Sequence, residues 1–176
     1  MNKSEILPLL NHSIPLFSSL VSALFIILQR WKLENKTDRK VYRISLAYFI
    51  IKALSWIGIL MYVYMPKSYS YIGSFHILGV LLIQVFFYQL IYTLTRRDDE
   101  QDFSFLHYVI PLFFFATHLV WSLFIPIDVQ MQITLAQGES VAGYEAYSSF
   151  FNSKFIIRFL FSLVYIVLCF SLYLLF

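Results

Sequence analysis

The chain has 176 residues, of which 60% are apolar, 20% aromatic and only 13% charged, and its formal net charge is +3. Soluble domains average about 45–50% apolar and about 25% charged residues. A chain of this size cannot bury so much apolar surface in one water-soluble core, so the composition excludes an ordinary soluble domain and predicts an integral membrane protein.

Five apolar stretches are long enough to cross a bilayer, because a hydrocarbon core about 30 Å thick needs roughly 20 residues of helix. Backbone groups in lipid must form hydrogen bonds within their own segment, which favours helices. The sequence therefore predicts one all-α domain over residues 1–176, a bundle of about five transmembrane helices. The expected spans are residues 6–28, 44–64, 71–94, 106–125 and 155–176, and a long outer loop is expected at residues 126–154.

Basic residues concentrate in the connectors on one side of these spans. Because Lys and Arg accumulate in short cytoplasmic loops, the first and third connectors are predicted to be cytoplasmic, with the N-terminus outside and the C-terminus inside. We interpret the first connector as a membrane-surface basic loop that contacts anionic lipid, at about 1 kcal/mol per residue, rather than as a nucleic-acid patch. Its six basic residues are Arg30, Lys32, Lys36, Arg39, Lys40 and Arg43.

Several Tyr and Trp residues occur near the ends of the expected spans. These amphipathic rings favour the boundary between lipid and water. We therefore interpret them as membrane anchors rather than as ligand-binding residues: Trp31, Tyr62, Tyr64, Tyr69, Tyr71 and Trp121.

Few charged or ionisable side chains are expected at membrane depth, and the main ones are Lys52, His76, His118 and Arg158. Such residues are costly in lipid and usually face the bundle interior or a cavity, so each is a candidate for binding a signal or ligand. Arg158 can also extend its long side chain to the interface. Lys52 can bind carbonyl groups, a Tyr hydroxyl or an anionic ligand, and structural and functional roles are both open for it.

All ten acidic residues fall in the N-terminal tail or the connectors. This excludes a carboxylate relay and a di-metal carboxylate site, and the chain has no motif of a zinc protease, a serine hydrolase or a phosphate-binding loop. His12, His76 and His118 are expected at similar depth, but no two of them have one-turn spacing, and we interpret them as single histidines bonded between helices rather than as zinc ligands. The sequence thus predicts no enzyme, no metal site and no cofactor.

Six stretches of the chain form a recognisable pattern: Leu82–Tyr88, Leu106–Pro111, Val120–Gln130, Tyr144–Ser148, Ser153–Lys154 and Arg158–Tyr165. Together they resemble the membrane half of Bacteroides-type membrane-bound regulators, in which a multi-span domain precedes a cytoplasmic AraC-family helix-turn-helix domain. The resemblance covers most of residues 40–170. It implies a multi-pass protein of the bacterial inner membrane that takes part in signal transduction and transcription regulation.

The expected function is therefore a membrane sensor or anchor domain that passes an envelope or membrane signal to a cytoplasmic DNA-binding domain. DNA contact is expected only through a C-terminal domain after Phe176, which this chain does not contain. We expect a homodimer in contact with membrane lipid, in which the fifth span carries the signal by a helix shift or altered dimer packing. The expected input residues of the outer loop, above His76, His118 and Arg158, are Asp128, Gln130, Gln132 and Glu145.

A small-solute transporter or permease subunit is the alternative function. In such a protein, Pro15 and Pro111 would interrupt helices around a site at the membrane midplane. Five spans do not divide into two equal repeats, and no internal repeat is visible in the sequence, which favours the sensor.

Overall fold

The computed structural model describes residues 3–32, 36–95, 102–136 and 139–175, although not the side chains of residues 3–10, 31, 32 and 175. Regular structure in the described residues is entirely helical. The elements are α1 (Lys3–Leu28), the short 3-10 helix η1 (Gln29–Lys32), α2 (Lys36–Tyr64), α3 (Pro66–Thr95), α4 (Leu106–Leu123), α5 (Ile127–Leu135) and α6 (Glu145–Leu175).

Five of these helices, α1, α2, α3, α4 and α6, are long and apolar enough to cross a membrane, with mean hydropathies between 1.5 and 2.4. Their outer faces carry large apolar side chains, such as Phe17 and Phe170, which are 63% and 65% exposed. In a soluble protein such a surface would drive aggregation, whereas lipid solvates it. The predicted helical membrane bundle is confirmed.

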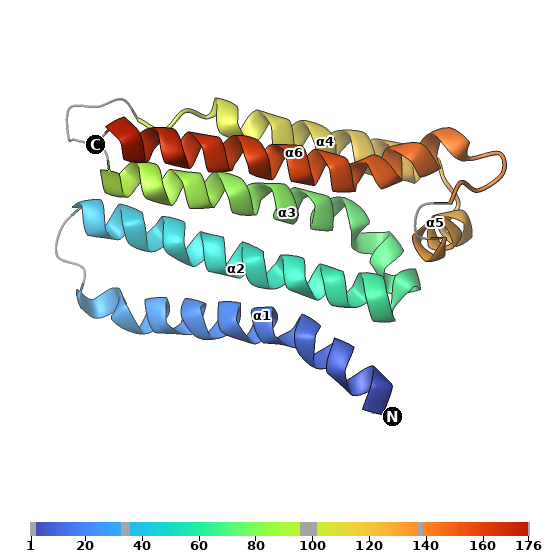
Figure 1. Cartoon of the computed structure of the whole chain (residues 1–176), viewed down its shortest axis with the longest axis horizontal. Coiled ribbons are helices and arrows are strands. Elements are labelled where there is room, and N and C mark those ends of the chain that lie inside the picture. Colours follow the sequence, from blue (N-terminus) through green and yellow to red (C-terminus); the bar gives the residue numbers. More distant parts are fainter. Residues whose placement is uncertain (1–2, 33–35, 96–101, 137–138, 176) are drawn as a thin grey trace.

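Helix α3 is the centre of the bundle (Figure 1). It packs against α2 on one side and against α4 and α6 on the other, and it also contacts the short helix α5. Helix α1 packs mainly against α2, at the edge of the bundle. We call the end of the bundle at which α5 lies the α5 end. The opposite end, where α1 ends and α2 begins, is the basic end.

Small residues allow α2 and α3 to approach closely. A Cβ atom on Gly58 of α2 would lie 2.6 Å from Cδ2 of His76 on α3, and one on Gly79 of α3 would lie 2.6 Å from Oγ of Ser55 on α2. Only glycine, which has no Cβ atom, leaves room for His76 beside position 58 and for Ser55 beside position 79. Close backbone approach of this kind stabilises helix pairs in lipid, where packing replaces the hydrophobic effect.

Two buried clusters join α3 to α6. The packed cluster, toward the basic end, consists of Leu81, Val85, Tyr88, Phe161 and Tyr165. The α5 cluster, at the α5 end, consists of Tyr69, Ile133, Tyr147 and Phe151. The fully buried Ile133 comes from α5, so this short helix closes the end of the bundle by packing into its interior.

The segment expected as a long outer loop, residues 126–154, differs from that expectation. It contains α5 and the first ten residues of α6, which begins at Glu145 rather than near residue 155. Gly143 has a φ of 79°, a conformation that glycine adopts without strain, and its N–H donates a 2.9 Å hydrogen bond to Oε1 of Glu145. This tight turn lies directly before α6, so α5 and the first part of α6 together take up most of the segment.

Candidate functional site

A small pocket lies between α3, α4 and α6, in the half of the bundle nearer the α5 end. Its volume is about 50 Å³. Four polar or charged side chains line it, namely His76, His118, Lys154 and Arg158, and the seven other lining residues are apolar or aromatic. We call it the polar pocket. On α3 and α6, the residues that line the polar pocket lie mostly between those of the α5 cluster and those of the packed cluster.

The first polar element of the site is a hydrogen-bonded row that links α6 to α3. Nζ of Lys154 donates to the hydroxyl of Tyr69 at 3.4 Å, and that hydroxyl lies 2.9 Å from Nδ1 of His76. Tyr69 is only 1% exposed. The imidazole of His76 also lies against Gly58 of α2, which leaves no space for it to move in that direction. These contacts hold His76 from two sides.

Aromatic rings surround the ammonium group of Lys154. Nζ lies 3.2 Å from the ring centre of Phe151, 4.9 Å from that of Tyr62, 5.1 Å from that of Phe155 and 5.3 Å from that of Tyr69. Cation–π attraction of this kind contributes about 2 kcal/mol or more where water is excluded. The rings stabilise a cation at this depth and fix its position beside the polar pocket.

His118 of α4 forms the opposite wall of the pocket and is 3% exposed. Its Nδ1 lies 2.8 Å from Oγ of Ser74 on α3, which orients the ring. Within the described residues, Nε2 of His118 and Nε2 of His76 are both buried without a hydrogen-bond partner. Buried polar atoms normally have partners, so each of these nitrogens has unused hydrogen-bonding capacity inside the bundle.

The charges of the polar pocket have one sign. None of its lining residues in the described chain is Asp or Glu, whereas Lys154 and Arg158 both carry cationic groups one helical turn apart on α6. Cations in a low-dielectric environment are stable when an anion or several hydrogen-bond acceptors compensate them. The arrangement therefore suits a ligand that is negatively charged or rich in acceptors.

The structure brings together three of the residues that the sequence singled out, His76, His118 and Arg158. Lys52 lies elsewhere. It belongs to α2, and its Nζ is 5.7 Å from the ring centre of Tyr48 and 6.0 Å from that of Phe49 on the same helix. It does not line the polar pocket.

The four outer-loop candidates belong to α5 and to the start of α6 rather than to the pocket. Nε2 of Gln130 donates to the carbonyl oxygens of Ser122 and Ile125, both at 2.8 Å, and thereby completes the C-terminal end of α4. Asp128 lies in the first turn of α5, Gln132 lies within α5, and Glu145 begins α6. None of them lines the polar pocket.

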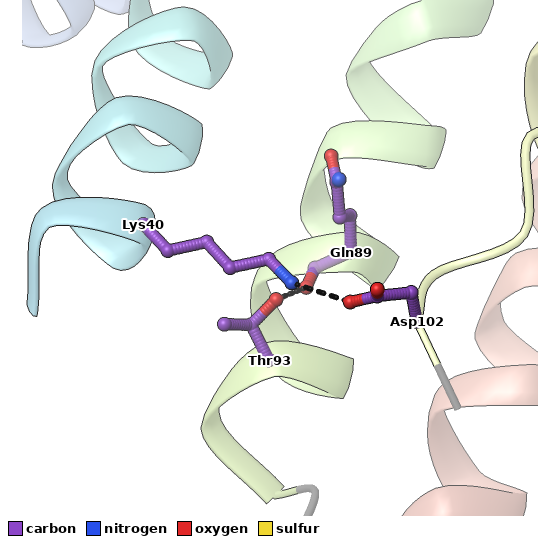
Figure 2. Close-up of polar contacts among 4 residues, drawn as sticks. All are labelled: Lys40, Gln89, Thr93 and Asp102. Atoms are coloured by element: carbon purple, nitrogen blue, oxygen red, sulfur yellow. Dashed lines mark hydrogen bonds and ion pairs between the residues drawn. The ribbon is translucent and has the colours of Figure 1, made fainter. Parts of the chain in front are cut away.

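The basic loop forms a second hollow, at the basic end. Arg30, Arg39, Tyr42 and Arg43 line a space of about 510 Å³, while the side chain of Lys32 lies outside the described residues and Lys36 is exposed. Lys40 of α2 forms an ion pair with Asp102, which precedes α4 (Figure 2). The N–O distance of this pair is 3.2 Å. Beside this pair, the hydroxyl of Thr93 donates to the carbonyl oxygen of Gln89 at 2.7 Å.

Sequence reasoning missed Lys154, Tyr69 and Ser74. Lys154 was assigned to the outer loop because α6 was expected to begin after it, and Tyr69 was interpreted as a surface anchor. The four-residue spacing of Lys154 and Arg158 could have identified Lys154, because residues four apart lie on one helix face. The burial of Tyr69 arises from the packing of α5 and α6 around it, which no local pattern reveals.

The described residues contain no group of three or more His, Cys, Asp or Glu side chains that could hold a metal ion. His12 stands apart from the other histidines, beside the ring of Tyr64, at 6.4 Å between ring centres. Comparisons of the chain with protein-family models, with curated proteins and with solved structures find no match. The resemblance to membrane-bound AraC-type regulators therefore stays a prediction from the sequence.

Proposed function

We propose that this chain is the membrane-embedded sensor domain of a signal-transducing protein, and that the polar pocket is its input site. In the finer form of the proposal, its output is a cytoplasmic AraC-type DNA-binding domain that follows Phe176 and regulates transcription, and the membrane is the bacterial inner membrane. The protein acts by binding and by helix movement rather than by catalysis.

The placement of two cations on α6 is the observation that carries this proposal. Lys154 and Arg158 line the pocket from α6, while His76 lines it from α3 and His118 from α4. A ligand that bonds to these groups together changes the distance between α6 and its neighbours. Small helix shifts at a ligand site are a recurrent way of transmitting a signal through a bundle.

The course of α6 supports an output at the basic end. This helix begins at the α5 end and continues past the packed cluster to the basic end (Figure 1). Arg30, Arg39 and Arg43 gather at the basic end, and the positive-inside rule makes such an end cytoplasmic. A movement of α6 that starts at the polar pocket would therefore be delivered to the cytoplasmic side.

The carrier alternative has less support from the helices. Interrupted helices typically form the midplane site of a secondary transporter. Here α1 continues through Pro15 and α4 continues through Pro111, which is buried within the bundle.

The native cysteine of α6 offers a direct test. Cys169 is partly buried against the packed cluster, about 22 Å along α6 from Lys154 at 1.5 Å per residue. Replacing the pocket residue Ile157 with Trp should wedge α6 away from α3. We expect this change to speed the modification of Cys169 by a membrane-permeant maleimide about three-fold or more, as local opening exposes the thiol.

The matched control for this test is Phe159→Trp, a similar enlargement at a side chain that is 67% exposed on the outer face of α6. We expect this variant to leave the modification rate of Cys169 unchanged. Equal rates in the unaltered chain, Ile157→Trp and Phe159→Trp would contradict the proposal, because the pocket would then have no mechanical connection to the inner part of α6.

A further inference from the structure

The polar groups of the pocket can act together as hydrogen-bond donors. Lys154 and Arg158 can only donate. Because Lys154 donates to the oxygen of Tyr69, the hydrogen of that hydroxyl is free to bond to Nδ1 of His76. A neutral His76 then carries its proton on Nε2, the atom that has no partner among the described residues. When Ser74 donates to Nδ1 of His118, Nε2 of His118 becomes a donor as well.

Such a set of donors calls for an acceptor with negative charge. A carboxylate offers two oxygens and about four lone-pair positions, enough for several donors at once. It would also compensate the cations on α6, which have no acidic neighbour among the described residues lining the pocket. Charge-assisted hydrogen bonds of this type are roughly twice as strong as neutral ones.

Size and lining restrict the ligand further. A space of about 50 Å³ accommodates a group on the scale of one or two water molecules, which fits a carboxylate better than a sugar or a phosphodiester. The remaining lining is apolar, and Phe155 beside it is 52% exposed on the outer face of α6. A hydrocarbon chain attached to the carboxylate would therefore continue from the pocket into lipid without meeting a polar surface.

We propose that the polar pocket binds the carboxylate of a long-chain fatty acid or a similar single-chain amphiphile that enters from the bilayer. Lys154 and Arg158 hold the carboxylate from α6, and His76 and His118 hold it from α3 and α4. The ligand thereby draws α6 toward α3. This inference names the ligand class of the proposed input site and so rests on the proposed function.

Fluorescence of Trp121 can report this binding. Its ring centre lies 5.0 Å from that of Phe150, which lines the pocket. The chain has three Trp residues, so replacing Trp31 and Trp56 with Phe leaves Trp121 as the single emitter. In this background, purified and placed in lipid nanodiscs, the probe is stearic acid with a nitroxide quencher on its fifth carbon. The methyl ester of the same molecule is the uncharged control.

We expect saturable quenching by the acid. The apparent affinity should be about ten-fold or more weaker for the methyl ester, which lacks the carboxylate charge, and for the acid in the Lys154→Gln variant, which lacks the ammonium charge. The matched control Lys52→Gln changes a lysine at membrane depth that does not line the pocket, and it should bind the acid as the unaltered chain does. Equal quenching by acid and ester, or an unchanged affinity in Lys154→Gln, would overturn the proposal.

Two further arms keep the test decisive. If Lys154→Gln does not fold, Arg158→Gln takes its place, because Arg158 is exposed and its loss leaves no cavity in a core. We expect it to weaken binding of the acid about three-fold or more. Acetate at millimolar concentration distinguishes a soluble carboxylate from an amphiphile: no displacement of the probe supports the proposal, and full displacement overturns the requirement for a hydrocarbon chain.

The two proposals can fail separately. Trp121 quenching measures occupancy alone, whereas modification of Cys169 in Ile157→Trp measures coupling without a ligand. Binding of the acid with no response of Cys169 would remove the sensor function and leave the ligand class standing. A response of Cys169 without binding of the acid would leave a sensor whose ligand is not a carboxylate amphiphile.

Discussion

Two regions of the seam between α3 and α6 each contain a hydrogen-bonded Tyr–His pair and differ in what surrounds that pair. In the packed cluster region, the hydroxyl of Tyr165 lies 3.0 Å from Nδ1 of His107 and 3.4 Å from its carbonyl oxygen. The ring of His107 also stacks on Phe103, with 4.8 Å between ring centres. In the polar pocket, Tyr69 bonds to Nδ1 of His76, but Nε2 has no partner among the described residues.

The difference teaches that a Tyr–His pair in a membrane bundle can complete a core or prepare a site. The deciding features are the space beside the pair and the charge that reaches it. No cation–π contact of a lysine is formed near His107 in the described part of the chain, whereas Lys154 bonds to the Tyr69 of the other pair. The packed cluster therefore accounts for stability, and the polar pocket is where binding is proposed.

The largest expected effect compares a tightly packed side chain with one that borders the cavity. Phe161→Ala removes a side chain that is 7% exposed in the packed cluster, and we expect a loss of about 3 kcal/mol in the free energy of unfolding. Ile157 is only partly buried and has fewer packing neighbours to lose beside the pocket, so Ile157→Ala should cost less, about 2 kcal/mol. Unfolding in mixed detergent micelles measures both. Equal losses would show that the two regions are packed alike.

The next comparison concerns how His76 is held. Gly58→Ala places a Cβ atom 2.6 Å from Cδ2 and 2.8 Å from Cγ of His76, so the whole ring must move. We expect a loss of about 2 kcal/mol in the free energy of unfolding. Gly73→Ala is the matched control, since its Cβ would lie 3.7 Å from Cε1 of His118. It should be neutral or stabilise by up to about 1 kcal/mol. A larger loss of unfolding free energy for Gly73→Ala than for Gly58→Ala would contradict the close contact between Gly58 of α2 and His76 of α3.

Removing each Tyr hydroxyl sharpens the comparison of the two pairs. Tyr69→Phe takes a partner from both His76 and Lys154, and we expect it to cost about 1.5 kcal/mol of unfolding free energy. Tyr165→Phe affects His107 alone and should cost about 0.6 kcal/mol, near the average for a hydrogen bond in a membrane bundle. The same detergent titration measures both, and a larger loss for Tyr165→Phe would contradict the role given to Tyr69.

The smallest effect is expected at the basic end. Asp102→Asn removes the ion pair with Lys40. The side chain of Lys40 is 42% exposed and that of Asp102 is 89% exposed. Exposed pairs of this kind contribute little, so the free energy of unfolding should change by less than about 0.5 kcal/mol. Lys40→Gln removes the same ion pair from its other side, so it serves as the control and should change the free energy of unfolding equally little. A loss above that of Tyr69→Phe would mean that the basic end, and not the α3–α6 seam, determines stability.

Much of the fold could be predicted because membrane spans follow from composition alone. The apolar runs define the five long helices, and the basic residues of the first connector gather at one end of the bundle, as expected. The segment at residues 126–154 could not be predicted in the same way. The early start of α6 depends on the turn at Gly143, and α5 is held by the burial of Ile133 rather than by a strong local pattern.

The candidate site could be predicted in part. The cost of a polar group in lipid singled out His76, His118 and Arg158 as separate candidates, and the structure places all three at the polar pocket. The same rule selected Lys52, which lies over rings of its own helix, because sequence alone does not show which face of α2 points to a cavity. Lys154 was missed since its depth depends on where α6 begins, and that boundary is set by tertiary contacts.

One measurement tests the central claim most directly: the rate at which a membrane-permeant maleimide modifies Cys169 in nanodiscs, with stearic acid or its methyl ester added. If the acid draws α6 toward α3, modification should slow about three-fold or more with the acid, and not with the ester, in the unaltered chain and in Lys52→Gln. The effect should be absent in Lys154→Gln. A rate that is the same with acid and ester in all three proteins would contradict a sensor whose input is the binding of a carboxylate amphiphile in the polar pocket.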